Sequence, residues 1–86
     1  MTTIWKYPLK LTDEQVVRMP EGGEILTAQM QGGTLCLWVL VNNEAPAQGR
    51  TIEVRGTGHP APNGCRYIAT TQMGQLVWHV FEREIA

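Results

Sequence analysis

The sequence predicts an all-β domain, built as a small barrel or sandwich of about seven short antiparallel strands. Turn-forming residues recur roughly every eight to twelve positions, and the segments between them are rich in Val, Ile, Leu, Thr and Trp, which is typical of all-β folds. Several of these segments also alternate apolar and polar residues with the period of a strand. With 86 residues, the chain has room for a single domain, residues 1–86.

The first two strands are expected on either side of a polar segment. In residues 4–11, aromatic and aliphatic residues alternate with lysine and proline. Pro8 cannot donate a hydrogen bond to a neighbouring strand, so this strand should lie at an edge or be bulged. The TDEQ segment that follows matches a helix capping box, but Pro20 disfavours helix just before it. The β-branched Val16 and Val17 favour a short second strand instead.

The middle of the chain contains the clearest hairpin signal. Residues 24–31 alternate, and Gly32-Gly33 then supplies two residues that tolerate positive φ, as two-residue hairpin turns require. Residues 34–41 are apolar at almost every position. A strand that is apolar on both faces is expected to be central in its sheet or to lie in a subunit interface.

The C-terminal half predicts three more strands and one irregular loop. In the first of these strands Ile52 and Val54 are expected inside and Glu53 outside, because strand side chains alternate between faces. The loop, TGHPAPNG, carries two prolines, two glycines and a histidine. Met73-Gly74 is predicted as the turn of a closing hairpin. These strands are expected at residues 50–56, 65–72 and 76–84.

The composition restricts the partners. Hydrophobic residues make up 43% of the chain and charged residues only 17%, against about 25% charged residues in an average domain. A domain of this size buries only roughly 60–65% of its unfolded surface. We therefore expect homo-oligomers that cover apolar strand faces. A net charge of −1 provides no basic surface for duplex nucleic acid.

The cysteines and the N-terminal segment favour an intracellular protein. Cys36 and Cys65 lack the close spacing of zinc ligands or of a disulfide framework, so both are interpreted as small buried hydrophobic residues. The N-terminal segment has no leader pattern, and no stretch approaches 18 apolar residues. We expect a cytoplasmic protein that does not bind membranes.

The residues give little support to catalysis. The chain has no serine, and Cys36 lies in the middle of an apolar strand, where a thiol is expected to be buried and inert. The histidines and cysteines are scattered singly, so no metal site is predicted, and His79 is interpreted as a hydrogen-bonded, partly buried residue. The acidic residues are interpreted as a solvated rim. We therefore predict no enzyme activity, no catalytic residue and no cofactor, with a small phosphodiester hydrolase using His59 or His79 as a remaining alternative.

One segment has the composition of a ligand site. In Gly56-Thr57-Gly58-His59-Pro60, small residues let backbone amides approach an anion, beside a hydroxyl group and an imidazole. The lysine, spacing and helix of a phosphate-binding loop are missing, so a plain connection between strands is the other interpretation. Arginines can clamp phosphate, and aromatic rings can stack on bases or fill the core. The candidate ligand-binding residues are Trp5, Tyr7, Trp38, Arg55, Thr57, Gly58, His59, Arg66 and Trp78.

Several segments in a fixed order resemble a known family. They are IWKYPL, MPEGGEIL, LWVLV, the strand at 50–56 with its GTGHP ending, and the terminal LVWHVFE. Together they resemble a family of short, largely uncharacterised proteins encoded by tailed phages and prophages. The resemblance covers residues 4–82 and brings no assigned catalytic residue.

The resemblance implies a phage context, and with it a function. Small, self-associating β proteins of phages include several that antagonise bacterial immunity by sequestering nucleotide signals. We therefore expect a non-catalytic sponge for a phosphorylated nucleotide, such as a cyclic nucleotide or an ADP-ribose derivative, in the host cytoplasm. Aromatic residues would stack on bases, and residues 57–59 with Arg55 and Arg66 would contact phosphates. The alternative is a protein-binding module that inhibits a host protein or contributes to virion assembly.

Overall fold

Seven antiparallel strands make up the regular structure of the described chain. The computed structural model describes residues 1–84. Both the all-β class and the number of strands were predicted from the sequence, and both are confirmed. The strands are β1 (Thr2–Pro8), β2 (Glu14–Pro20), β3 (Glu24–Gln31), β4 (Thr34–Asn42), β5 (Ala47–Gly56), β6 (Cys65–Met73) and β7 (Leu76–Arg83).

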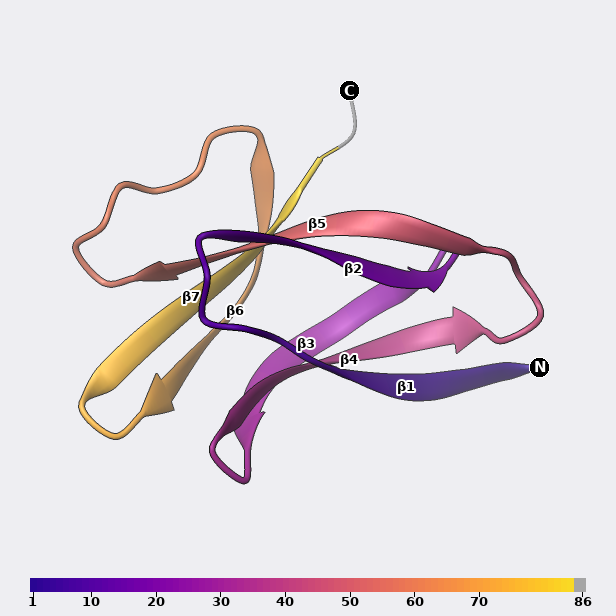
Figure 1. Ribbon diagram of the computed structural model, residues 1–86, viewed down its shortest axis with the longest axis horizontal. Coiled ribbons are helices and arrows are strands. Elements are labelled where there is room, and N and C mark those ends of the chain that lie inside the picture. The colour runs from indigo at the N-terminus through magenta and orange to yellow at the C-terminus, as the bar shows by residue number, and fades with distance from the viewer. Residues whose placement is uncertain (85–86) are drawn as a thin grey trace.

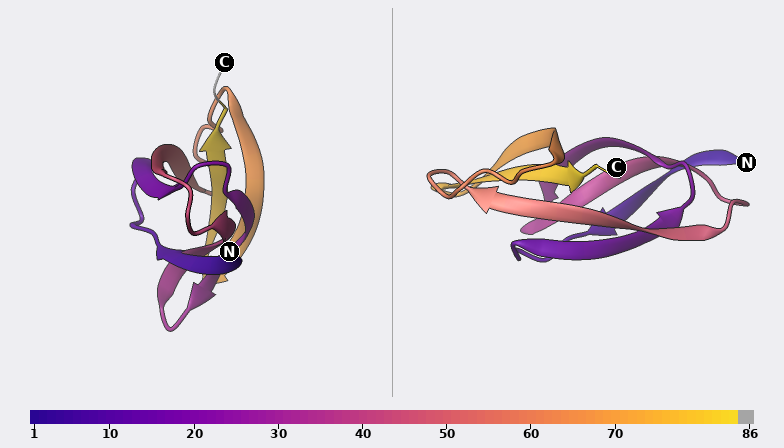
Figure 2. Two further views of the ribbon diagram at one scale, coloured as in Figure 1. Left: turned by 90° about the vertical axis from the view of Figure 1, so that its right-hand side faces the viewer. Right: turned by 90° about the horizontal axis from the view of Figure 1, so that it is seen from above.

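The strands form two sheets that pack face to face (Figure 1). In the three-stranded sheet, β4 lies between β1 and β3, and the four-stranded sheet has the order β2-β5-β7-β6. The edge strands β3 and β6 pack beside each other, yet the two sheets remain separate layers (Figure 2). The molecule is therefore a sandwich, and the barrel that the sequence left open as an alternative is wrong.

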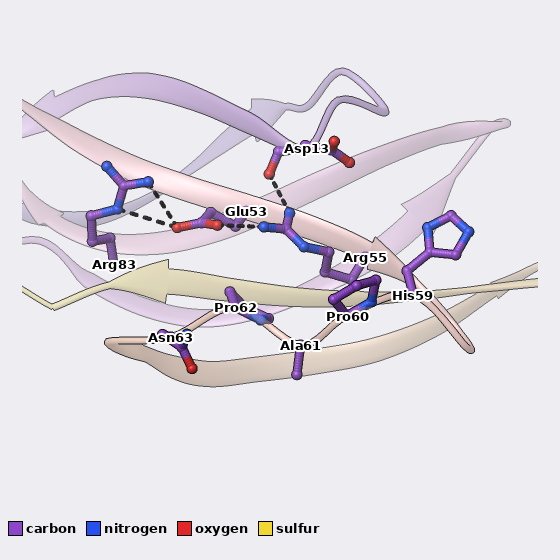
Figure 3. A pocket seen from close by; sticks show the side chains of 9 residues that line it. All are labelled: Asp13, Glu53, Arg55, His59, Pro60, Ala61, Pro62, Asn63 and Arg83. Atoms are coloured by element: carbon purple, nitrogen blue, oxygen red, sulfur yellow. Dashed lines mark hydrogen bonds and ion pairs between the residues drawn. The ribbon is translucent and has the colours of Figure 1, made fainter.

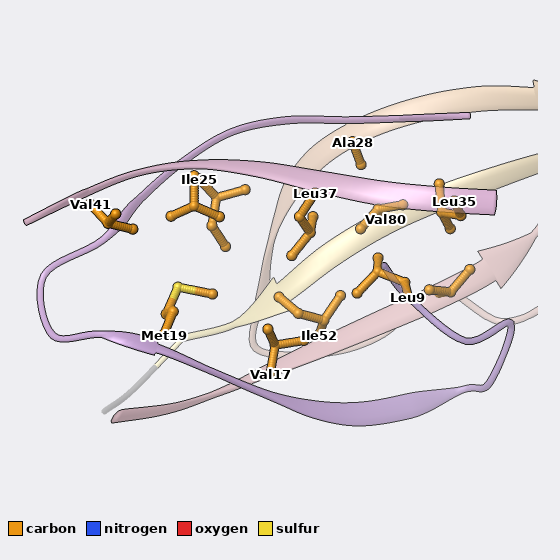
Figure 4. Close-up of a cluster of buried hydrophobic side chains, with 12 residues drawn as sticks. Leu9, Val17, Met19, Ile25, Ala28, Leu35, Leu37, Val41, Ile52 and Val80 are labelled. Carbon is orange, nitrogen blue, oxygen red and sulfur yellow. The ribbon is translucent and has the colours of Figure 1, made fainter. Parts of the chain in front are cut away.

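The core lies between the two sheets and takes one side of each central strand (Figure 4). Leu37 and Val39 of β4, Ile52 of β5 and Val80 of β7 have no exposed surface. Their alternation along each strand defines an inner face, which packs against the other sheet, and an outer face. The buried apolar residues of the core are Leu9, Val17, Met19, Ile25, Ala28, Leu35, Leu37, Val39, Val41, Ile52, Val54 and Val80.

The β3–β4 hairpin confirms the turn and the central strand that the sequence predicts. Gln31 pairs with Thr34, so Gly32 and Gly33 form a two-residue loop, with φ values of 55° and 81°. Such turns need positive φ at both positions, which glycine adopts without strain. β4 then pairs with a strand on each side.

The first strand is shorter than the sequence predicts. β1 ends at Pro8 instead of continuing to Leu11. After Pro8 the chain turns inward, so that Leu9 is buried in the core while Leu11 is 48% exposed. The side chain of Gln15 fixes this turn by bonding both the N–H (3.0 Å) and the C=O (2.7 Å) of Lys10.

Two further details of the C-terminal half correct the sequence interpretation. Ile52 and Val54 are inside as predicted, but Glu53 on the outer face is not solvated and has only 4% of its surface exposed, because arginine side chains cover it. In the second hairpin, Met73 pairs with Leu76. The turn is therefore Gly74-Gln75, one residue later than predicted.

Candidate functional site

The predicted ligand segment is a tight turn at the end of β5. The His59 N–H donates to the C=O of Gly56 (3.1 Å), and Gly58 has a φ of 90°. A β-turn with positive φ at its third position favours glycine there. The His59 N–H is therefore not free to bind an anion, and the main role of the segment is to reverse the direction of the chain.

Two hollows meet at this turn. The larger, about 490 Å³, lies at the end of the β5–β7 pair, and we call it the Trp78 hollow. The smaller, about 230 Å³, is lined by Arg55, Gly58, His79 and Phe81 together with the turn. The Trp78 hollow is lined by Gly56, Thr57, His59, Gln75, Leu76, Val77 and Trp78.

Two aromatic rings meet beside Gly56 at the Trp78 hollow. Gly56 pairs directly with Trp78 across β5 and β7. A Cβ atom added at Gly56 would lie 3.6 Å from the nearest ring atoms of both Trp78 and His59, which is an ordinary contact distance. The rings of Trp78 and His59 therefore approach the same point of the backbone.

Trp78 carries an unsatisfied donor at this position. Its side chain is half-buried and packs against the core. Among residues 1–84, its indole N–H is a buried side-chain group without a hydrogen-bond partner. Leaving such a donor unpaired costs about 1–3 kcal/mol. An acceptor that reached this N–H would therefore stabilise the structure.

His79 lies beneath the turn and is held by two threonines. Its Nε2 is 2.8 Å from the hydroxyl oxygen of Thr57, and its Nδ1 is 2.9 Å from the hydroxyl oxygen of Thr70. Thr70 in turn bonds the hydroxyl of Tyr67 (2.7 Å). These contacts confirm the interpretation of His79 as a hydrogen-bonded, partly buried residue, and they attach the turn to β6 and β7.

A polar groove of about 460 Å³ lies beside the turn, under the loop 59–63 (Figure 3). Arg55 donates to Glu53 (2.7 Å) and to the backbone C=O of Asp13 (2.6 Å). Arg83 donates to Glu53 (3.1 Å) and to Glu14 (2.6 Å). Both guanidinium groups of the groove are therefore already paired with carboxylates of the same chain.

Glu53 is the centre of this network and is stabilised as a carboxylate. Burial alone would raise its pKa, but hydrogen bonds from Cys65, Arg83 and Arg55 outweigh burial and lower the pKa below its usual value. The Cys65 thiol donates to Glu53 (3.2 Å), and burial and this carboxylate raise the pKa of Cys65. The interpretation of both cysteines as buried hydrophobic residues therefore holds for Cys36 only.

A second buried carboxylate, Glu82, lies on the inner face of the same sheet. It accepts hydrogen bonds from Arg50 and from Arg66 (2.9 Å), and Arg50 also donates to the C=O of Gly23 (2.8 Å). Burial would raise the pKa of Glu82, but the two arginines lower it overall. The prediction that all acidic residues form a solvated rim is wrong for Glu53 and Glu82.

The predicted arginine clamp is not assembled. Arg55 pairs with His79 across β5 and β7 and lies on the outer face, whereas Arg66 pairs with Glu82 on the inner face. Their guanidinium groups bond different carboxylates. Arg55 and Arg66 therefore do not converge on one phosphate position.

Three of the predicted aromatic residues also lie elsewhere. Tyr7 packs against the core, and burial raises its pKa. Trp5 is 41% exposed on the edge strand β1. Trp38 lies on the outer face of β4, and none of the three lines either hollow at the turn.

The structure brings Thr57, His59 and Trp78 together, with Gly58 in the adjoining turn. Leu76 and His79 are site residues that the sequence prediction missed. The signal that finds them is the pairing of β5 with β7, because this register places the end of β7 beside the turn.

The described residues contain neither a cluster of metal ligands nor a membrane-spanning helix. No group of three or more His, Cys, Asp or Glu side chains within residues 1–84 is arranged to hold a metal ion. Residues 1–84 also contain no helix that is long and apolar enough to cross a membrane.

Fold and site together define a small all-β sandwich with a hollow of ligand size at one end of its larger sheet. The chain belongs to the family described as "Domain of unknown function (DUF7352)", whose model matches residues 1–86. This match confirms an uncharacterised family over the whole chain, while the phage origin that the resemblance implies stays a prediction. No curated protein and no solved structure matches the chain.

Proposed function

We propose that this protein is a phage-type, non-catalytic protein that binds and sequesters a phosphorylated nucleotide signal of bacterial immunity in the Trp78 hollow. The observation that carries the proposal is the convergence of Trp78, His59 and Thr57 on one hollow of about 490 Å³. Small-molecule sites have volumes of about 300–1,000 Å³ and combine apolar walls with a few polar groups. A cyclic nucleotide or an ADP-ribose derivative has the matching chemistry.

Each group of the hollow has a role in this proposal. The rings of Trp78 and His59 both approach the position where Gly56 lacks a side chain, and a base stacks on such aromatic surfaces. Leu76, 53% exposed, extends the apolar wall. The Thr57 hydroxyl, oriented by His79, bonds a ribose or phosphate oxygen.

Sequestration requires no reacting group, and the site is consistent with this requirement. Both ring nitrogens of His79 already have hydrogen-bond partners, and the carboxylates of Glu53 and Glu82 are paired with arginines. These pairings favour binding over a hydrolase that uses His79 or one of these carboxylates, since such a group must exchange protons with the ligand.

Native mass spectrometry with a panel of cyclic nucleotides and ADP-ribose derivatives tests the proposal. We expect a stoichiometric complex that releases the ligand chemically intact after denaturation. Thr57→Val and His59→Ala are expected to weaken binding about tenfold or more, equivalent to about 1.4 kcal/mol. Thr34→Val, in the distant β3–β4 hairpin, is the matched control and should bind normally.

The other outcomes discriminate between the alternatives. Release of a converted product would establish a hydrolase instead of a sponge. Failure to bind any member of the panel would remove the nucleotide proposal and leave the protein-binding module.

A separate observation favours that second candidate. β2 is an edge strand of the four-stranded sheet, and Val16 on it is 64% exposed. Exposed edges bind extended peptides by adding a strand. A partner bound in this way would slow amide exchange in β2, and Val16→Lys would weaken that complex without changing ligand binding at the Trp78 hollow.

A further inference from the structure

The free edge of β2 presents main-chain groups that β5 does not use. β2 is an edge strand that pairs with β5. At the two ends of this pairing, the C=O of Asp13 accepts from the N–H of Val54 (3.3 Å), and the N–H of Glu21 donates to the C=O of Pro46 (2.8 Å). Bonding residues alternate along an antiparallel strand. The odd-numbered residues of β2 therefore bond β5.

The even-numbered residues consequently point their N–H and C=O groups toward the free edge. Those within the strand are Glu14, Val16 and Arg18. The C=O of Glu14 accepts from the hydroxyl of Thr12 (3.3 Å), which fits a group that faces away from β5. The side chains of these residues share the outer face of the sheet, because the alternate residues Val17 and Met19 are buried in the core.

The side chains along this edge are arranged as an acid, an apolar residue and a base. Glu14 is 54% exposed and bonds Arg83 through Oε2, so its Oε1 has no partner within residues 1–84. Val16 is 64% exposed. Among residues 1–84, Arg18 is the one arginine outside any ion pair, and its guanidinium donates to the C=O of Ala47 (3.4 Å).

We propose that the edge of β2 binds β2 of a second copy of this chain, with Val16 opposite Val16 on a twofold axis. The two strands run antiparallel, so the two four-stranded sheets join into one continuous sheet. Glu14 of each copy then lies opposite Arg18 of the other, because both residues are two positions from Val16. The N–H and C=O groups that face the free edge bond their counterparts across the axis, and the twofold repeats the Glu14–Arg18 contact.

Charge selects this register. A shift of one residue in either direction separates the two charges, for example by placing Arg18 opposite Val16. A shift of two residues places Glu14 opposite Glu14, or Arg18 opposite Arg18. Like charges directly across two strands weaken the pairing, whereas opposite charges strengthen it. The axis at Val16 therefore gives the complementary arrangement.

Main-chain hydrogen bonds, more than buried area, hold this dimer together. An exposed strand edge is a template for pairing with another chain, and strand addition derives its affinity from main-chain bonds. In the view from above in Figure 2, β2 runs along the lower margin of the molecule. The remainder of each copy therefore lies on the far side of its own β2, and the edge is open to a second copy.

Sedimentation velocity between about 1 and 300 μM, the range expected for a small interface, is the direct test. The wild-type protein should shift from monomer to dimer in this range. Glu14→Lys and Arg18→Glu, each alone, place like charges opposite each other in both contacts and should weaken the dimer about tenfold. An equimolar mixture of the two variants should associate about as strongly as the wild type, because every base of one variant then faces an acid of the other.

Recovery in the mixture separates the interface from a folding defect, because mixing two misfolded chains would not restore association. Lys6→Glu and Glu24→Lys, in the other sheet, are matched charge reversals that should leave association unchanged. A monomer at every concentration would overturn the proposal and leave the edge of β2 to a foreign peptide. A mixture that fails to recover association would overturn it as well.

Amide hydrogen exchange, followed by mass spectrometry with fragmentation to single residues, tests the register. The amides of Val16 and Arg18 should exchange more slowly at about 300 μM than at about 1 μM, whereas that of Val17, which faces β5, should be protected at both. Concentration-dependent protection at Val17 instead of Val16 would contradict the register. β2 supplies none of the residues that line the Trp78 hollow, so these results do not depend on the proposed ligand.

Discussion

The outer faces of the two sheets differ in how their side chains are satisfied. On the four-stranded sheet, Glu53 is buried and accepts hydrogen bonds from Arg55, Arg83 and Cys65. On the three-stranded sheet, the outer face carries Ile4 and Trp38, and within residues 1–84 no side chain of this face belongs to an ion pair. The outer face of the four-stranded sheet is thus stabilised by ion pairs, whereas that of the three-stranded sheet is not.

This difference explains why arginines near the turn in the sequence are a poor indicator of a phosphate site here. Arg55 and Arg66 were the natural candidates for phosphate contacts, but each is bound to a buried carboxylate. Removing an arginine from such a pair would leave a buried charge alone, which costs several kcal/mol. Ligand contacts are therefore assigned to the neutral groups of the Trp78 hollow.

The largest expected effect comes from Glu53. Glu53→Ala leaves Arg55 without its carboxylate and Arg83 with Glu14 alone, and it should lower the free energy of unfolding by about 3 kcal/mol. Ile4→Ala, at a position of the other outer face that is 55% exposed, should cost only about 1 kcal/mol. Urea denaturation measures both, with Glu21→Ala in an exposed turn as a control. Equal costs for Glu53→Ala and Ile4→Ala would contradict the difference between the two faces.

Acid is expected to remove the same stabilisation. The pKa values of Glu53 and Glu82 are lowered in the folded protein, so the unfolded chain takes up protons first as the pH falls. The stabilisation is complete above the ordinary glutamate pKa of about 4.5 and is lost as the pH falls through the folded pKa values. Urea midpoints between pH 7 and pH 3 should fall steeply below about 4.5.

The double variant Glu53→Gln/Glu82→Gln provides the control for this pH dependence. Its midpoint should be lower at pH 7 but should change less between pH 5 and pH 3. A variant as acid-sensitive as the wild type would show that other carboxylates cause the loss.

The folding pattern was predictable where it depends on residues close in sequence. Gly32-Gly33 predicted its hairpin, and the doubly apolar segment 34–41 predicted a central strand. The first strand was misplaced at its end because Leu9 is drawn into a core made by distant strands. The alternation of apolar and polar residues predicts which face of a strand a side chain lies on. It does not predict which distant segments pack against that face.

The site was only partly predictable for the same reason. Thr57, His59 and Trp78 were candidates from composition, but their convergence follows from the pairing of β5 with β7, which skips β6 in the sheet order. The burial of Glu53 likewise depends on Arg83, 30 positions away. Neither the convergence at the hollow nor the burial of Glu53 can be predicted from the residue pattern of a single segment.

Gly56 provides a smaller and more selective test. A methyl group at Gly56 would make ordinary contacts of 3.6 Å with Trp78 and His59, so Gly56→Ala should change the free energy of unfolding by less than about 1 kcal/mol. It should nevertheless weaken nucleotide binding about tenfold, because the methyl group takes up space in the hollow beside both rings. Calorimetric titration checks the second effect, and unchanged affinity would place the ligand elsewhere.

The smallest expected effect concerns the two cysteines. Burial and Glu53 raise the pKa of Cys65, so this half-buried thiol should react slowly with iodoacetamide at pH 7. Glu53→Gln removes the negative charge and should speed alkylation of Cys65 several-fold. Cys36, only 2% exposed, is the internal control, and its acceleration in the same variant would indicate general loosening instead.

The three tryptophans allow the division between the two regions to be measured in one experiment. Trp78 lines the hollow, Trp38 lies on the outer face of β4 and Trp5 on the edge strand β1, and each indole N–H gives its own resonance in a nitrogen–proton correlation spectrum. Addition of the nucleotide that binds best should shift the Trp78 signal and leave the Trp38 and Trp5 signals in place. A ligand that leaves Trp78 unchanged, or that shifts Trp38 or Trp5 instead, would contradict the account.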